Sequence, residues 1–178
     1  MFVEKNWDDG VILYTITSGT YTAGIISLGA SLQSYKYKDT DVVLGFDNTY
    51  AYKAQDCFIG QIVGPFANRI KDATFKLDGK TYNLDKNDNG NSLHSGSKNF
   101  GLDNWSLKDH SDNYVTLALV STPKGGFDQT YNVEVKYTLN ENGELSIEYK
   151  MQSDKDLLAI KDEIVVATEG LKKNKFKI

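Results

Sequence analysis

The sequence has little cysteine, little histidine and no long apolar run, and each shortage argues against a class of protein. Cys57 is the only cysteine among 178 residues, so no disulfide can form within the chain, which fits a reducing compartment. No stretch approaches the ~20 apolar residues that span a membrane, and the first ten residues do not resemble a signal peptide. We therefore expect a cytoplasmic protein without a membrane partner.

Basic residues are not in excess either. The chain has 20 basic and 24 acidic residues, a formal charge of −4 and a pI near 5.2, so we expect no nucleic-acid partner. With two histidines and one cysteine, a zinc site built from these residues is not expected. Phosphate-binding loops, dinucleotide-binding glycine motifs, zinc-protease helices and Gly-x-Ser-x-Gly elbows are also absent. We therefore expect none of these common metal, nucleotide or dinucleotide sites.

Short alternating strands are what the sequence does contain. The clearest is the hairpin pattern from Thr74 to Leu84, in which two alternating runs flank Asp78-Gly79. Apolar residues also alternate with polar ones in Tyr131–Leu139 and again from Leu145. Because no strand–helix–strand alternation is visible, the expected fold is all-β, mainly antiparallel and sandwich-like.

Several local predictions accompany this fold. Asn48–Gln55 fits either a short helix or a plain loop. Val42–Gly45 and Phe58–Val63 are β-prone, and Gly60 and Gly64 mark bends or close approaches in the second of them. Further paired strands are expected at Trp105–Lys108 and Tyr114–Val120. The turn between them would expose His110. Cys57, next to Phe58 and Ile59, is expected to be a buried small hydrophobic residue rather than a nucleophile.

Two stretches carry the candidate chemistry, 91–96 (Asn-Ser-Leu-His-Ser-Gly) and 60–70 (Gly-Gln-Ile-Val-Gly-Pro-Phe-Ala-Asn-Arg-Ile). His94 could act in general acid–base chemistry or donate a hydrogen bond to a ligand oxygen, and the alternative is a surface histidine without a role. Arg69 could hold two ligand oxygens, or it could form a structural ion pair. The Asn, Asp, Trp and Tyr residues around both stretches suit sugar hydroxyls and sugar faces, and the same composition is also common in ordinary β loops.

At these residues the chain resembles the amino-terminal portion of the aldose 1-epimerase family, the galactose mutarotases. Residues 64–70 (Gly-Pro-Phe-Ala-Asn-Arg-Ile) are similar to the family's Gly-Arg-Tyr-Ala-Asn-Arg-Ile, and residues 91–96 are similar to its Asn-x-Leu-His-Gly-Gly. Residues 29–34 (Gly-Ala-Ser-Leu-Gln-Ser) and 41–46 (Asp-Val-Val-Leu-Gly-Phe) resemble two earlier strands of the family. The hairpin from Phe75 to Leu84 falls in order between these motifs.

The resemblance implies a β-supersandwich, here a partial one, and an isomerase that interconverts the α and β anomers of free hexoses such as galactose or glucose. In the family, a glutamate takes the proton of the anomeric hydroxyl and a histidine protonates the ring oxygen, without metal or cofactor. By resemblance, His94 corresponds to the first family histidine and is the catalytic candidate. Arg69 and Asn68 correspond to substrate-binding positions.

The chain also departs from the family. The Asn-His-x-Tyr-Phe-Asn motif that holds the second family histidine has no counterpart, because residues 156–162 read Asp-Leu-Leu-Ala-Ile-Lys-Asp. The glutamate base also has no match. We therefore expect a mutarotase-like domain over residues 1–156 and a divergent tail over 157–178, of the kind that a frameshift or premature stop produces. The resulting enzyme would be truncated and impaired.

Two other functions stay open at this stage. Unrecognised residues or a partner chain could complete an active epimerase. Alternatively, the chain could be a non-catalytic carbohydrate-binding or interaction domain. A partial sandwich would leave exposed sheet edges, which favour pairing into a homo-oligomer.

Overall fold

The computed structural model describes residues 1–154, and nearly all of their regular structure is antiparallel β. The expected boundary at residue 156 and the segment 157–178 lie outside the described residues. The elements in chain order are β1 (Val3–Asp8), β2 (Val11–Ser18), β3 (Tyr21–Ile26), β4 (Ser31–Tyr37), β5 (Thr40–Asp41), α1 (Thr49–Ala54), β6 (Arg69–Ile70), a 3₁₀ turn (Lys71–Ala73), β7 (Thr74–Leu77), β8 (Lys80–Asn83), β9 (Ser92–Leu93), a 3₁₀ turn (Phe100–Leu102), β10 (Ser106–Ser111), β11 (Tyr114–Ser121), β12 (Tyr131–Leu139) and β13 (Leu145–Ser153).

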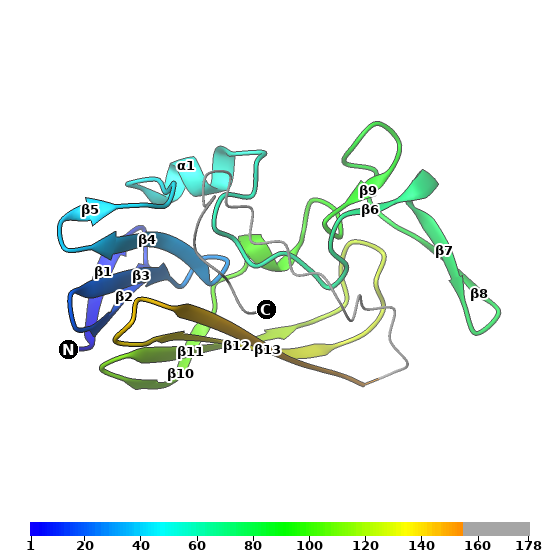
Figure 1. Ribbon diagram of the computed structural model, residues 1–178. Coiled ribbons are helices and arrows are strands. Elements are labelled where there is room, and N and C mark those ends of the chain that lie inside the picture. The colour runs from blue at the N-terminus through cyan, green and yellow to red at the C-terminus, as the bar shows by residue number, and fades with distance from the viewer. Residues whose placement is uncertain (155–178) are drawn as a thin grey trace.

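Two antiparallel sheets make the body of the molecule. Strands β1 to β5 form one sheet in chain order, and β10 to β13 form the other. The ribbons β6–β9 and β7–β8 project at the far end from β1 (Figure 1). This arrangement confirms the all-β, mainly antiparallel prediction.

The core lies between the two sheets because each inner strand presents one apolar face. Alternate residues of β12 from Tyr131 to Leu139 are buried, as are Ile16, Ala23 and Leu32 of the facing sheet. The period-2 alternation seen in the sequence therefore marks the inward face. Tyr137 also ties the sheets together, since its buried hydroxyl donates to the Ala30 carbonyl at 2.7 Å.

The segment 58–63 that leads to the candidate site is half-buried to buried and begins with a turn, and it forms no strand of a sheet. Gly60 was predicted as a close-approach point, and this is confirmed, because a Cβ there would lie 2.3 Å from the Leu32 carbonyl oxygen. The main chain explains the contact: the Leu32 N–H donates to the Gly60 carbonyl. The predicted strand over Phe58–Val63 is wrong, because the segment is held by scattered hydrogen bonds instead of a ladder.

Of the two alternatives for Asn48–Gln55, the structure has the short helix, α1. The predicted hairpin is confirmed. Asn48 caps α1 by accepting a hydrogen bond from the Ala51 N–H at 2.9 Å, which is the expected role of asparagine at a helix start. Asp78 and Gly79 both have positive φ between β7 and β8, as a tight hairpin turn requires.

Three local predictions are wrong. Cys57 is exposed rather than buried, because the chain leaves α1 through a surface bend. Val42–Gly45 is not a strand, since β5 ends at Asp41. His110 is exposed as expected, but it lies in β10 rather than in a turn, and its ring stacks on Phe2 at 3.9 Å.

Candidate functional site

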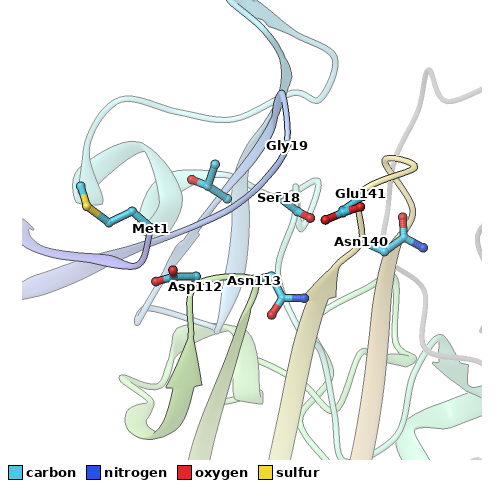
Figure 2. Close-up of a pocket in the computed structure, with 8 residues that line it drawn as sticks. Met1, Ser18, Gly19, Asp112, Asn113, Asn140 and Glu141 are labelled. Atoms are coloured by element: carbon cyan, nitrogen blue, oxygen red, sulfur yellow. The ribbon is translucent and has the colours of Figure 1, made fainter.

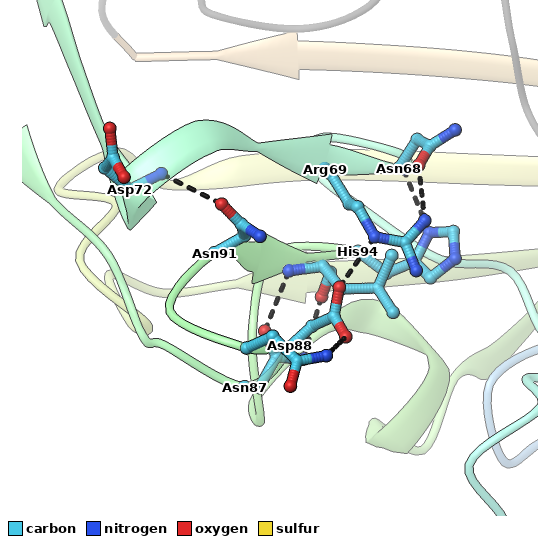
Figure 3. Close-up of polar contacts among 9 residues, drawn as sticks. Asn68, Arg69, Asp72, Asn87, Asp88, Asn91 and His94 are labelled. Atoms are coloured by element: carbon cyan, nitrogen blue, oxygen red, sulfur yellow. Dashed lines mark hydrogen bonds and ion pairs between the residues drawn. The ribbon is translucent and has the colours of Figure 1, made fainter.

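Pairing of β6 with β9 brings the two candidate stretches together. Arg69 lies opposite Leu93, the last residue of β9, so His94 comes directly after the paired segment. The His94 N–H donates to the Asn68 carbonyl at 3.0 Å, which extends the ladder by one bond. All three residues predicted from the sequence, Asn68, Arg69 and His94, therefore gather at one place on the surface (Figure 3).

A hydrogen bond from the main chain sets the protonation state of His94. The Asn68 N–H donates to His94 Nδ1 at 3.1 Å. A neutral imidazole has one acceptor nitrogen and one donor nitrogen, so the Nε2 atom must carry the proton. His94 therefore presents an N–H donor on the side of the ring that Asn68 does not use.

The surroundings favour this neutral form. Partial burial lowers the pKa of the His94 imidazole below its ordinary value, and the positive charge of Arg69 lowers it further. Both effects act against a second proton on the ring. Near neutral pH the histidine is a donor through Nε2 without a charge of its own.

Phe58 packs against the His94 ring and was not singled out in the sequence. The two ring centroids lie 4.5 Å apart with an interplanar angle of 61°. Phe58 has a φ of 56°, and such a conformation is costly for a bulky residue. This ring contact and the hydrogen bond from the Asn68 N–H together restrict the position of the imidazole.

Arg69 is held by an acidic partner that was also not foreseen. Its Nε donates to Asp88 Oδ2 at 2.6 Å, and its Nη1 lies 3.4 Å from Asn68 Oδ1. The structural ion pair considered from the sequence is thus present. Because Nε carries the pair, most of the N–H groups at the outer end of the guanidinium stay available to a ligand.

A tight turn and the side-chain amide of Asn87 position β9. Asn89 and Gly90 both have positive φ, and Asp88 and Asn91 exchange two backbone hydrogen bonds across them. Asn87 then pairs with Leu93 as a strand would, because its side chain accepts from the Leu93 N–H and donates to the Leu93 carbonyl. The Asn-Gly dipeptide was the sequence signal for this turn.

Ser95 anchors the loop on its other side. Its hydroxyl accepts from the Phe66 N–H at 2.7 Å and donates to the Phe66 carbonyl at 2.9 Å. Ser95 is buried and has a φ of 69°. The serine that stands where the family resemblance has glycine is therefore a structural tie between the two candidate stretches.

A separate hollow of about 540 Å³ lies where the turns of the two sheets meet (Figure 2). Three of the polar residues that line it form hydrogen bonds within the fold. Asp112 accepts from the Phe2 N–H, Asn113 donates to the Leu139 carbonyl, and Asn140 bonds within its own turn. We assign no ligand to this hollow.

Within residues 1–154, no group of three or more His, Cys, Asp or Glu side chains could hold a metal ion. No helix in the same part of the chain is long and apolar enough to cross a membrane.

The site as built offers hydrogen-bond donors to a ligand. His94 supplies one N–H, and Arg69 supplies the outer end of its guanidinium. Protein groups already occupy His94 Nδ1 and the Nε of Arg69. The arrangement suits a small ligand rich in acceptor oxygens.

Comparison with known proteins finds relatives for most of the chain. The aldose 1-epimerase family profile matches residues 13–159. The chain is 39% identical over 147 residues to galactose mutarotase from Bos taurus and 33% identical over 145 residues to the Homo sapiens protein. Each match covers 79% of this chain but 42% of the relative, so the chain spans less than half the length of these proteins.

Solved structures show the same fold. The GalM/aldose epimerase homologue from C. elegans superposes with a TM-score of 0.72 at 28% identity, covering 86% of this chain and 46% of that one. Galactose 1-epimerase from Lactobacillus acidophilus gives 0.73 at 21% identity, covering 87% and 48%. Because the family profile matches most of this chain, residues 13–159, the chain belongs to the aldose 1-epimerase family.

Proposed function

We propose that this chain binds a free hexose such as galactose or glucose, as part of an aldose 1-epimerase that interconverts the α and β anomers. The donor pair formed by His94 Nε2–H and the Arg69 guanidinium carries the proposal. A pyranose presents a ring oxygen and several hydroxyl oxygens close together, and these are the acceptors that such a pair would grip. Asn68, beside both groups, is the third proposed contact.

Anomer exchange also requires two proton transfers. A base takes the proton of the anomeric hydroxyl, the bond from C1 to the ring oxygen breaks, and an acid protonates that oxygen; after rotation about C1–C2 the ring closes again. Only proton transfers are involved, so we propose that no metal or cofactor takes part. The single cysteine supports a cytoplasmic location.

These 178 residues supply one imidazole at the proposed site. The other, His110, lies on β10 in a different sheet. The sequence also lacks a recognisable match to the family's glutamate base. We therefore propose that residues 1–156 form the sugar-binding unit, that 157–178 lie outside it, and that the chain alone is impaired in catalysis. The family match, which ends at residue 159, supports a boundary near this point.

Calorimetric titration with galactose tests the binding part. The wild-type chain should give saturable binding, and His94→Ala or Arg69→Ala should weaken it about 2- to 10-fold, as expected for one hydrogen bond worth about 0.5–1.5 kcal/mol. His110→Ala is the matched control and should bind as the wild type does. Unchanged affinity in both site variants would refute the assignment.

Polarimetry of freshly dissolved α-galactose tests the catalytic part. An acid and a base each contribute about 10²–10⁴-fold, so a chain without the pair should barely exceed the rate in buffer. A rate far above buffer that disappears in His94→Ala would show that other residues complete the catalytic site.

One feature supports an interaction role as a second candidate. Among the described strands, β13 pairs with β12 alone, and its residues 145–152 run beside β12 without a bulge. A long regular edge of this kind favours pairing with another strand, so we propose homo-oligomer formation through it. Light scattering after size exclusion should then show mass rising with concentration, whereas a constant monomer mass would contradict the proposal.

A further inference from the structure

Asp88 is held at the site by both its backbone and its side chain. It occupies the first position of the Asn89-Gly90 turn, where its N–H and carbonyl both bond to Asn91. Its carboxylate is also fully engaged, since Oδ2 accepts from Arg69 Nε at 2.6 Å and Oδ1 accepts from Asn89 Nδ2 at 3.1 Å. A carboxylate fixed by backbone and side chain together can determine where its partner lies.

The ion pair is asymmetric in its exposure. The Asp88 side chain is 20% exposed, whereas that of Arg69 is 56% exposed. The carboxylate is thus the more shielded partner. Figure 3 shows the guanidinium of Arg69 lying between Asp88 and Asn68, beside the His94 ring. Because the guanidinium is planar and rigid, fixing its Nε restricts the plane in which the remaining N–H groups point.

The pair also sets the charge that a ligand meets. Asp88 contributes −1 directly against the +1 of Arg69, and His94 is uncharged in the form described above. An anion that binds there would lose hydration without a net positive charge to compensate. A neutral polyol would still find the N–H donors.

From this geometry we propose that Asp88 is a specificity-determining residue: by fixing Arg69 through Nε and cancelling its charge, it makes the site select uncharged aldoses over anionic sugars such as uronates and sugar phosphates. The inference rests on the sugar-binding function proposed above. It adds a role for a residue outside the motifs that carry the family resemblance.

The test compares galactose with galacturonate in the wild-type chain and in Asp88→Asn, which keeps the size of the side chain. Removing the charge should weaken galactose binding a few-fold and raise the ratio of galacturonate to galactose affinity ~10-fold. At constant ionic strength, inorganic phosphate should compete with galactose in Asp88→Asn and not in the wild type. Both effects follow from an Arg69 charge that is no longer cancelled.

Asp9→Asn is the matched control for net charge. Asp9 forms an exposed ion pair with Lys53 in the turn after β1, and its positive φ suits asparagine equally well. This variant should keep the wild-type ratio of galacturonate to galactose affinity. The Nε–H signal of Arg69 should be protected from solvent exchange in the wild type and in Asp9→Asn, and lose that protection in Asp88→Asn.

The outcomes separate the two hypotheses. Suppose that the wild type binds galactose, but Asp88→Asn weakens the binding of galactose and of galacturonate equally, or has the same affinity ratio as Asp9→Asn. Asp88 is then merely structural, and the specificity proposal is wrong. If the wild type shows no saturable galactose binding, the sugar-binding function itself fails, and the specificity proposal with it.

Discussion

At the scale of single residues, the proposed function depends on main-chain groups as much as on side chains. The Asn68 N–H fixes which nitrogen of His94 bears the proton, and the Ser95 hydroxyl joins the two site stretches. The sequence motifs named His94, Arg69 and Asn68 correctly as neighbours. They could not reveal Phe58 or Asp88, because those contacts depend on how the β6–β9 ribbon folds.

Protonation of His94 should weaken sugar binding. The folded-state pKa is lowered from 6.5, so the neutral form and the stability it contributes are fully present above pH ~6.5 and are lost as pH falls through the folded pKa. A protonated Nδ1 would face the Asn68 N–H, donor against donor. NMR titration of the His94 ring should give a midpoint below 6.5, with galactose affinity falling over the same range. A midpoint above 6.5 would contradict this description.

Ser95 allows a paired test of hydrogen bonding against backbone strain. Ser95→Ala removes two hydrogen bonds to Phe66 and should cost about 1–3 kcal/mol of unfolding free energy. Ser95→Gly loses the same bonds but relieves the positive φ, so it should be about 1 kcal/mol more stable than Ser95→Ala. Denaturant unfolding measures both. Equal stability of the two variants would show that φ is unstrained at this position.

At the scale of elements, tight hairpins decide where the site lies. The Asp78-Gly79 hairpin was predictable, because flanking alternation and turn chemistry agree. The Asn89-Gly90 turn carries the same kind of dipeptide, but the polar sequence before it lacks strand alternation and resembles a plain loop. The failed strand predictions at Val42–Gly45 and Phe58–Val63 have a related cause, since β-prone composition does not provide a neighbouring strand.

Two glycines give a matched test of the site hairpin. Gly90 and Gly79 both have positive φ, and a Cβ at either would meet no atom within 4 Å. Alanine at either position should therefore cost about 1 kcal/mol and lower Tm by a few degrees. Only Gly90→Ala should also weaken galactose binding, because only that turn holds Asp88. If both variants bind galactose with the same affinity, the Asn89-Gly90 turn does not position the site.

At the scale of the whole molecule, the two sheets form a scaffold whose stability should be separable from sugar binding. The alternation in Tyr131–Leu139 was enough to predict the inward face of β12. Which sheet it faces could not be predicted, because residues such as Tyr137 and Ala30 are brought together only by the tertiary fold. The exposure of Cys57 was missed for the same reason.

Tyr137→Phe tests this separation. The substitution leaves the buried Ala30 carbonyl without the hydroxyl that donates to it and should lower the free energy of unfolding by about 1–3 kcal/mol. Galactose affinity should stay at the wild-type value, since Tyr137 lies in the core. A marked loss of affinity in the folded variant would mean that the sheets and the site are coupled.

The most direct test of the central claim is a galactose titration of the isotope-labelled chain followed by NMR. The side-chain N–H signals of His94 and Arg69 should shift together and saturate at one dissociation constant, while the His110 ring stays unchanged. Shifts confined to another region, such as the hollow between the sheet turns, or no shift at all, would contradict the claim that the β6–β9 ribbon binds sugar.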